Sequence, residues 1–386
     1  MNALKPYILV FVLVIVAGVI YFLESTKPLH PKETDGKSDI ALVTEEISPD
    51  AAARIAEKEK KYEIAKEIST PDGFINTPAT NLGKPGPITV GQYIGKKVIL
   101  VDFWTYSCIN CQRTLPYLND WYTKYEDEGL VIIGLHTPEF EFEKKYDNVL
   151  EAVKKYDIKY PVVLDNDFST WNAYGNRYWP RKYLVDIDGF IVYDHIGEGA
   201  YDETEEKIQE LLEERMHVLG VAGAITQKIG GVKNAITVTP GGVQSPEIYF
   251  GAARNEFLGN GSQGFIGEQT LTLPSSINPN TLYLGGAWNF ASEFAETKSI
   301  NNTIVFPYSA KNVYFVAGSA KGVKVHVLLD GKSVQNSKGS DVGSDGTLMI
   351  KENRLYKIIE GSTYGPHTLE LKVDGAGLQA FTFTFG

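Results

Sequence analysis

The chain has 386 residues, a formal net charge of −11 and 43% hydrophobic residues. The acidic balance argues against nucleic acid as a partner, and the hydrophobic fraction is too low for a protein that crosses a membrane many times. The length is enough for two or three domains with separate cores. Only two cysteines are present, Cys108 and Cys111, which is too few for a secreted scaffold held by disulfides.

An uncharged apolar run occupies residues 7–23, between Lys5 and Glu24. A run of about 17 residues is at the lower end of what spans a bilayer as a helix. A cleaved signal peptide is the alternative, but no small-x-small cleavage site follows the run. We therefore expect residues 1–24 to be a membrane anchor. Lys5 favours a cytoplasmic amino terminus, so the rest of the chain is expected outside the cytoplasm, in the periplasm or at the cell surface.

Residues 25–70 are expected to form a polar stalk that ends in a charged helix. Ser48 is suited to cap this helix and Pro49 to occupy its first position, and the helical pattern continues to about Ile68. The helix is rich in Lys and Glu and has only a thin apolar stripe. This composition indicates a solvated spacer.

Residues 71–216 alternate predicted strands and helices. The strands are expected at 98–104, 130–135, 162–165, 183–187 and 190–195, and the helices at 111–125 and 143–156. Asp202 and Glu205 have the spacing of a capping box for a last helix. The order predicts an α/β domain with a mixed central sheet flanked by helices.

Residues 217–244 are rich in Gly, Val and Ala and are expected to link two domains. Beyond Ser245, short alternating stretches are separated by clusters of Gly, Asn, Asp and Ser. The clearest of them lie at 281–284, 312–317, 323–329, 368–373 and 380–385. This texture predicts that residues 245–386 form an all-β antiparallel sandwich.

Cys108 and Cys111 lie where the apolar strand at 98–104 passes through a short turn into a helix. The amide groups and the dipole at a helix start stabilise negative charge on the first cysteine, and thiolate is the attacking species. Two intervening residues let the second sulfur reach the first when a mixed disulfide is resolved. We therefore predict Cys108 as the nucleophile, Cys111 as the buried resolving thiol and a reversible Cys108–Cys111 disulfide.

Three other uses of this cysteine pair are weaker. A zinc site needs four ligands, and neither a second cysteine pair nor a nearby histidine pair exists. Covalent haem attachment needs a histidine where Gln112 stands. A purely structural disulfide across so short a loop would constrain little unfolded-chain entropy.

Val101-Asp102-Phe103-Trp104-Thr105-Tyr106-Ser107-Cys108-Ile109-Asn110-Cys111 resembles the active-site segment of thioredoxin-family proteins. It is most similar to the TlpA/ResA-like group and to the exported C-terminal part of DipZ-type cytochrome c biogenesis proteins. Further matching segments are residues 136–140, 171–180 and 197–204. The resemblance covers roughly residues 74–212, and more weakly 245–247 and 381–386. It implies a thioredoxin fold followed by a jelly-roll-like, carbohydrate-binding-like sandwich.

The resemblance also implies roles for single residues. Asp102 matches the family's buried acid that moves a proton for the second cysteine, and burial in a strand should raise its pKa. Pro116 matches the proline that kinks the active-site helix. Pro180 matches the family's cis-proline, so a cis Trp179–Pro180 bond is expected beside the cysteines.

The chain departs from thioredoxin in two respects. Ile109 and Asn110 replace the Gly-Pro of thioredoxin, so its reduction potential cannot be transferred. The sequence shows no obvious lysine to pair with Asp102.

Other residues are weaker candidates. Four residues within the matched segments are candidates to bind the client: Trp104, Ile109, Asn110 and Trp179. Glu139 is either a second acid near the site or an ordinary surface loop residue.

Two other activities remain open in the sequence. Thr105 and Cys108 have the Thr-x-x-Cys spacing of peroxiredoxins, although Val101 replaces their proline. A Sco-like copper carrier would need His136 or His195 as a ligand, and a wider cysteine spacing.

The sequence therefore predicts a membrane-anchored thiol–disulfide oxidoreductase without a further cofactor. A reductant in cytochrome c maturation or in disulfide repair is expected from the resemblance, with apocytochrome c as one client and a CcdA-like membrane protein as electron donor. The aromatic residues of the last domain could stack on a glycan or could form its core; they include Tyr249, Tyr283, Trp288 and Phe290. The net direction of electron flow and the oligomeric state do not follow from the sequence.

Overall fold

The structure, a computed structural model, describes residues 48–233, 235 and 241–386. Across these ranges no helix combines the length and the apolar character needed to cross a bilayer. The anchor predicted at residues 7–23 lies outside the described residues.

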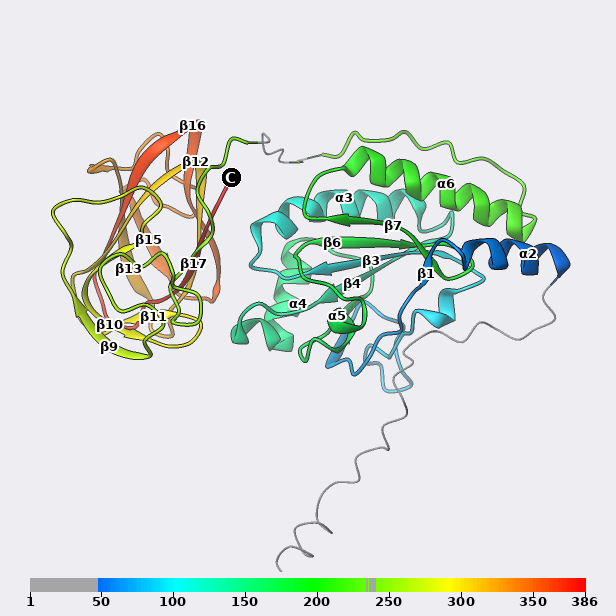
Figure 1. The fold of residues 1–386 in the computed structure, drawn as a ribbon, viewed down its shortest axis with the longest axis horizontal. Coiled ribbons are helices and arrows are strands. Elements are labelled where there is room, and N and C mark those ends of the chain that lie inside the picture. Colours follow the sequence, from blue (N-terminus) through cyan, green and yellow to red (C-terminus); the bar gives the residue numbers. More distant parts are fainter. Residues whose placement is uncertain (1–47, 234, 236–240) are drawn as a thin grey trace, which may run out of the picture. The chain divides into compact units, whose positions relative to one another are not determined.

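The first domain is built on a seven-stranded mixed sheet with the order β1-β7-β6-β3-β4-β5-β2. The neighbouring strands β7, β6, β3 and β4 can be followed in Figure 1. The central strand β3 runs parallel to β4 and antiparallel to β6. Every residue of β3 and β4 is buried, as expected for strands covered on both faces. The strands are β1 (Glu63–Ile64), β2 (Gly73–Ile75), β3 (Val98–Trp104), β4 (Leu130–His136), β5 (Val162–Leu164), β6 (Arg181–Val185) and β7 (Phe190–Ile196).

Helices cover both faces of this sheet. They are α2 (Pro49–Lys58), α3 (Ile109–Tyr125), α4 (Tyr146–Lys155), α5 (Ser169–Ala173) and α6 (Tyr201–Leu219), with 3₁₀ turns η1 (Gly91–Tyr93) and η2 (Glu141–Lys144). Helices α3, α4 and α6 share a core with Leu100 of β3, whereas α5 packs with Phe103. Because side chains alternate along a strand, Asp102 lies on the α3 face.

Three details of the predicted elements are wrong. The helix α2 ends at Lys58 rather than near Ile68, and the chain then adds the short edge strand β1. The helix expected from Glu143 begins at Tyr146, after the separate turn η2. Asp202 and Glu205 form no capping box, because α6 begins after Ala200 in a left-handed conformation and Glu205 instead accepts hydrogen bonds from α3.

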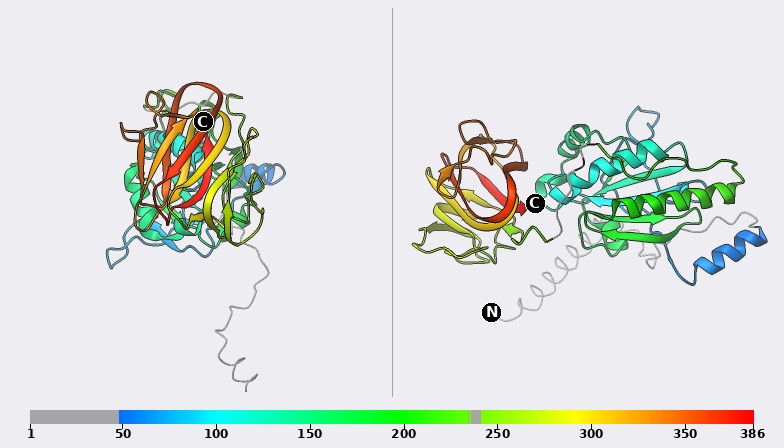
Figure 2. Two further views of the ribbon diagram at one scale, coloured as in Figure 1. Left: turned by 90° about the vertical axis from the view of Figure 1, so that its left-hand side faces the viewer. Right: turned by 90° about the horizontal axis from the view of Figure 1, so that it is seen from above.

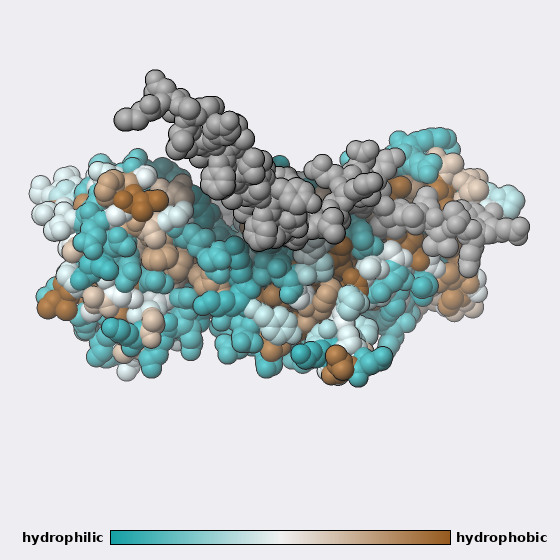
Figure 3. Space-filling model, turned by 90° about the horizontal axis from the view of Figure 1, so that it is seen from below, coloured by the Kyte–Doolittle hydropathy of each residue, from teal (hydrophilic) through white to brown (hydrophobic). Residues whose placement is uncertain are grey.

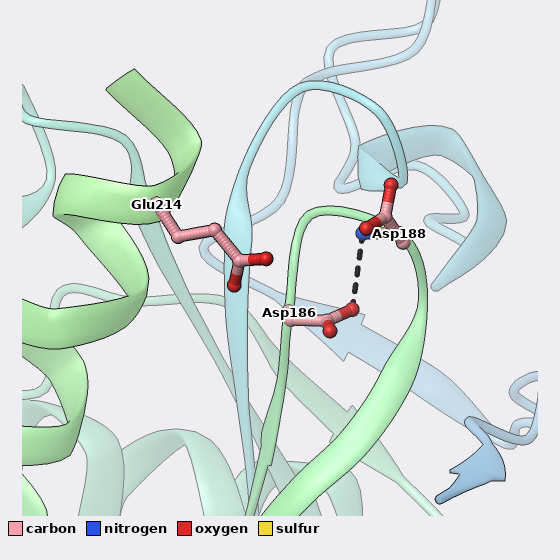
Figure 4. Close-up of side chains that lie close together, drawn as sticks. All are labelled: Asp186, Asp188 and Glu214. Atoms are coloured by element: carbon pink, nitrogen blue, oxygen red, sulfur yellow. Dashed lines mark hydrogen bonds between the residues drawn. The ribbon is translucent and has the colours of Figure 1, made fainter. Parts of the chain in front are cut away.

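The helix α2 is docked and is not the solvated spacer that its composition suggested. Asp186, Asp188 and Glu214 converge from the β6–β7 turn and α6 (Figure 4). Their carboxylates are the kind of group that could hold a metal ion, but the Lys58 ammonium lies 2.6, 2.8 and 2.6 Å from them. Arg54 adds two hydrogen bonds of 2.7 Å to Asp188. The cluster therefore holds a helix.

The second domain is all-β and antiparallel, as expected, and its strands join one ten-stranded sheet. This domain is coloured yellow-green to red in Figure 2. The long strands β12 and β16 pair with each other across a register shift near Ala310, and residues on both sides of it enter one core. The jelly-roll-like arrangement stays an expectation. The strands are β8 (Ile248–Tyr249), β9 (Gly267–Leu271), β10 (Tyr283–Phe290), β11 (Ala295–Thr297), β12 (Asn302–Gly318), β13 (Val323–Leu329), β14 (Lys332–Ser333), β15 (Thr347–Ile350), β16 (Arg354–Val373) and β17 (Gln379–Phe385).

The aromatic residues considered for glycan stacking lie mostly inside this core. Tyr283, Trp288 and Phe290 are 4%, 0% and 1% exposed, so none of them offers a ring face to a sugar. Tyr249 is half-buried, and the guanidinium of Arg254 lies 3.7 Å from its ring centre. The interpretation as core therefore holds for Tyr283, Trp288 and Phe290 but not for Tyr249.

The β domain contacts the first domain through aromatic and charged groups. Phe381 of β17 packs against Phe140 and Phe142, with ring centres 5.1 and 4.8 Å apart. Arg254 forms an ion pair with Glu139 at 2.8 Å.

On the visible part of the face in Figure 3, hydrophilic residues predominate and hydrophobic ones form small groups, in keeping with the net charge.

Candidate active site

The end of β3 and the start of α3 position the two sulfurs. Cys108 is the N-cap residue of α3, and its Sγ accepts a hydrogen bond from the backbone amide of Cys111 at 3.4 Å. Both cysteines are free thiols in this structure. Cys108 is partly exposed, whereas Cys111 is 1% exposed. The geometry is that of an accessible sulfur at a helix start with a second, covered sulfur one turn away.

Glu143 holds the loop that precedes Cys108, a role that sequence reasoning missed. Its buried carboxylate accepts hydrogen bonds from the backbone and hydroxyl of Ser107 at 3.2 and 2.6 Å. It also accepts from the backbone amides of Glu139 and Phe140. Burial raises the pKa of Glu143, although these hydrogen bonds oppose the rise. No local spacing indicates this contact, because it joins residues 36 positions apart.

The loop before β6 forms the other side of the cysteine site. The Trp179–Pro180 peptide bond is cis, as expected. The carbonyl oxygen of Trp179 lies 4.0 Å from Cys108 Sγ. The Trp179 indole donates to the carbonyl of Thr137 at 3.0 Å and packs against Trp171. Pro180 thus places a backbone carbonyl beside the exposed sulfur.

Asp102 lies buried on the face of the sheet that α3 covers, close enough to Cys111 to act on its charge. It is 1% exposed, and neither carboxylate oxygen has a hydrogen-bond partner among the described residues. Burial raises the pKa of Asp102 from 3.8 to about 7, against the opposing charge of Lys182. A carboxyl group with this pKa can exchange a proton near neutrality.

Lys182 is the lysine that the sequence did not reveal. It is the cross-strand partner of Asp102 on β6, so both side chains share the α3 face of the sheet. Lys182 is fully buried, and its ammonium donates to the carbonyl of Gly197 at 3.2 Å. Burial lowers the pKa of Lys182, whereas Asp102 raises it. Its position two residues after Pro180, on a strand antiparallel to β3, is the signal that could have found it.

Cys111 is poor at losing its proton unaided. Burial raises its pKa well above the ordinary value, and the hydrogen bond with Cys108 and the nearby Asp102 raise it further. A resolving thiol in this position needs a base at the moment of attack. Asp102 is the buried carboxylate that acts electrostatically on it.

Arg113 is a third residue that the sequence did not reveal. Arg113 follows Cys111 by two residues on α3. Its guanidinium is 3% exposed and donates two hydrogen bonds of 2.7 Å to Glu198 and one to Asn110. Burial opposes its charge, but the bonds with Glu198 and the proximity of Cys108 raise the pKa of Arg113. The site therefore contains an ion pair between the buried Arg113 and Glu198 close to the cysteine helix.

Most of the other candidate residues meet at one cleft of about 520 Å³, which is lined by Cys108, Ile109, Asn110, Glu139 and Trp179. Glu139 is engaged by Arg254 and by the hydroxyl of Tyr249 at 2.9 Å. Trp104 is the exception. It is fully buried with its ring edge-on to His136, so the expected contact with a client is wrong. A larger cleft of about 910 Å³ near Arg354 includes neither cysteine.

The histidines do not join Cys108 in a metal site. His136 is fully buried between Trp104 and Tyr106, and burial lowers its pKa to about 3. His195 lies near the carbonyl of Glu198, at 3.3 Å. Within residues 48–233, 235 and 241–386 no metal-binding cluster includes a cysteine or histidine. The copper-carrier interpretation thus has no ligand set here.

Two family models match the chain. Residues 72–194 match the AhpC/TSA family, and residues 245–386 match the thioredoxin like C-terminal domain. The boundary of the second match falls where the β domain begins.

Several curated proteins are similar in sequence. The DipZ proteins of Mycobacterium bovis and Mycobacterium tuberculosis are each 35% identical over 325 residues, which is 83% of this chain and 43% of the relative. The chain thus spans less than half the length of these relatives. The thiol-disulfide oxidoreductase ResA of Bacillus thuringiensis is 34% identical over 155 residues, which is 40% of this chain and 82% of ResA. A solved thiol:disulfide interchange protein from Bacteroides sp. is 24% identical, with coverages of 38% and 89% and a TM-score of 0.30.

Proposed function

Since the chain belongs to the ResA-type family of thioredoxin-like thiol-disulfide oxidoreductases, we propose that it exchanges disulfides with client proteins through Cys108 and Cys111. The observation that carries the proposal is the pair itself. One sulfur is accessible at a helix start and accepts an amide hydrogen bond from the residue that bears the other. The sulfur pair is proposed to work without a further cofactor.

Attack on the client begins at Cys108. Its thiolate attacks one sulfur of a client disulfide, the client's other sulfur leaves as a thiolate, and a mixed disulfide forms. The backbone amide of Cys111 at the start of α3 donates a hydrogen bond to this sulfur, as such amides do for attacking sulfurs at helix starts. The Trp179 carbonyl borders the same sulfur and would contact the client backbone.

Resolution of the mixed disulfide requires Cys111. Asp102 takes the proton of the Cys111 thiol, and the thiolate attacks Cys108 Sγ and expels the client as a second thiolate. The client disulfide has then gained two electrons, and Cys108 and Cys111 are joined. Asp102 has the burial, position and pKa for this task, and Lys182 keeps that pKa from rising further.

Reduction of insulin by the purified protein with a dithiol reductant tests the proposal. Cys108→Ser is expected to abolish turnover, because it removes the attacking sulfur. Turnover retained by this variant would remove Cys108 from the mechanism.

The cellular setting is also proposed. We infer an extracytoplasmic enzyme held by an anchor at residues 1–24, with the thioredoxin-like domain at 71–216, a linker at 217–244 and the β domain at 245–386. Of the stalk expected at 25–70, the part that forms α2 and β1 packs on the thioredoxin-like domain and belongs to it. The sequence resemblance supports a reductant in cytochrome c maturation or disulfide repair, recharged by a CcdA-like membrane protein. Apocytochrome c is a proposed client.

Thiol peroxidase activity is the second candidate, since residues 72–194 match the AhpC/TSA family. Its support within the site is weak. The hydroxyl of Thr105 is buried and lies 3.4 Å from the His136 ring, and no contact with Cys108 Sγ is found for it among the described residues. Peroxide consumption by the purified protein at a rate comparable to insulin reduction would favour this candidate.

A further inference from the structure

We propose that the β domain supplies part of the client-binding site, and that the cleft beside Cys108 accepts an extended, cysteine-containing segment of a polypeptide. This inference rests on the proposed function and specifies its substrate. The first domain alone does not complete the cleft, whose other wall consists of Ser245, Glu247, Tyr249, Arg254, Thr384 and Phe385. A client that reaches Cys108 by this route must therefore touch the β domain.

Two buried polar atoms at this cleft have no partner. Arg113 Nη1 and Thr384 Oγ1 are without a hydrogen bond in the part of the chain that the structure describes, and their residues are only 3% and 6% exposed. Both residues line the cleft. Buried polar groups are nearly always paired, so each unpaired one calls for an explanation. A ligand that supplies hydrogen-bonding groups to both atoms explains them.

The two atoms come from different domains but share a neighbour. Thr384 on β17 is the cross-strand partner of Tyr314 on β12. The Arg113 guanidinium on α3 lies 6.0 Å from the ring centre of Tyr314. The proposed site thus combines Arg113 from the cysteine helix α3 with Thr384 from β17, the last strand of the β domain.

The chemistry of these groups matches a polypeptide backbone. Arg113 can only donate, Thr384 can donate or accept, and the Trp179 carbonyl beside Cys108 accepts. An extended segment presents carbonyl and N–H groups in alternation, as peptides do when they bind along exposed backbone. The volume of about 520 Å³ falls in the range of pockets that hold small or segmental ligands. Docking of a folded client protein would need a larger contact area than this cleft provides.

The wall is held in place by the contacts of Glu139. This carboxylate receives the Arg254 guanidinium at 2.8 Å and the Tyr249 hydroxyl at 2.9 Å. The same contacts cover the face of Tyr249, which disfavours stacking on a sugar ring. Glu139 therefore acts as a positioning residue that fixes the β domain against the cysteine site.

Thr384→Val tests the inference, because valine keeps the shape and removes the hydroxyl. The measurement compares kcat/KM for an unstructured ten-residue peptide carrying a glutathione mixed disulfide with kcat/KM for 2-hydroxyethyl disulfide. We expect the ratio of the two to fall about fivefold, the effect of losing one hydrogen bond of about 1 kcal/mol. Thr384→Ser should restore the ratio. Thr382→Val, which removes a buried hydroxyl outside the cleft on the same strand, should leave the ratio unchanged.

An unchanged ratio in a Thr384→Val protein with wild-type circular dichroism would overturn the inference, as would equal losses on both substrates. Thr384-dependent inhibition by a neutral oligosaccharide, or equally fast reduction of a folded protein with a surface disulfide, would also overturn the assignment to an extended segment. If the wild-type protein reduced neither disulfide, the proposed function itself would fail, and that result is distinct from the others.

Discussion

Replacing Asp102 by Asn removes a titrating group close to Cys111 while keeping nearly the same side-chain shape. If Asp102 is the base for Cys111, resolution of the mixed disulfide should slow by about 100-fold near pH 7, since general base catalysis contributes 10²- to 10⁴-fold. The wild-type rate should rise with pH through an inflection near 7, where Asp102 loses its proton. The variant should lack that inflection.

The pH dependence of the free energy of unfolding gives an independent measure of the pKa of Asp102. The pKa of Asp102 is about 7 in the folded state and close to 3.8 in the unfolded chain. Below pH 3.8 the carboxyl group is neutral in both states, so folding does not bury a charge. As the pH rises toward 7 the unfolded chain loses its proton first, so the free energy of unfolding falls by about 4 kcal/mol through this group. The free energy of unfolding of the Asp102→Asn variant should not fall in this way, although Lys182 then lacks its negative neighbour.

Two experiments measure these effects. Stopped-flow decay of a preformed mixed disulfide between about pH 5 and 9 gives the resolution rate, and urea unfolding over the same range gives stability. We expect the variant to resolve more slowly yet to be more stable than the wild type at about pH 8. Equal pH profiles of both proteins in the rate measurement would refute the role of Asp102. Equal stability profiles would refute its raised pKa.

Three further predictions concern other parts of the site and fold. Cys111→Ser should accumulate a mixed disulfide on Cys108, visible as a client adduct by mass spectrometry; rapid release of the client would contradict it. Lys182→Met should move the inflection in the resolution rate to higher pH, because the ammonium lowers the pKa of Asp102; an inflection at the wild-type pH would exclude this coupling. Lys58→Ala should lower the free energy of unfolding by about 3 kcal/mol at neutral pH, because it leaves three carboxylates without their shared cation; a change within about 0.5 kcal/mol would show that the cluster does not hold the helix.

The parts of the site that lie close together in sequence were predictable. The apolar strand at 98–104, the turn and the helix that carries Cys111 follow from local patterns, and these patterns place both cysteines. Lys182 was missed because its relation to Asp102 depends on the register between β3 and β6, which spans 80 positions of the sequence. Glu143 was missed for the same reason, since it reaches Ser107 only after the chain has folded.

The role of the β domain at the site also lay beyond sequence reasoning. The sequence does not show whether an aromatic residue of a β domain points into the core or toward a ligand. The structure places Trp288 and Phe290 in the core. The approach of Thr384 to the cleft depends on docking between domains. The charged composition of α2 suggested solvent exposure, but Lys58 and Arg54 find their partners in a turn that is distant in sequence.

The equilibrium of the cysteine pair with a glutathione redox buffer tests the central claim most directly. Trapping and mass analysis of the protein at each buffer ratio would count its thiols. The account predicts one two-electron transition between the dithiol and a Cys108–Cys111 disulfide, at a potential more negative than that of glutathione. A pair that stayed as two thiols throughout, or that formed only mixed disulfides with glutathione, would contradict it.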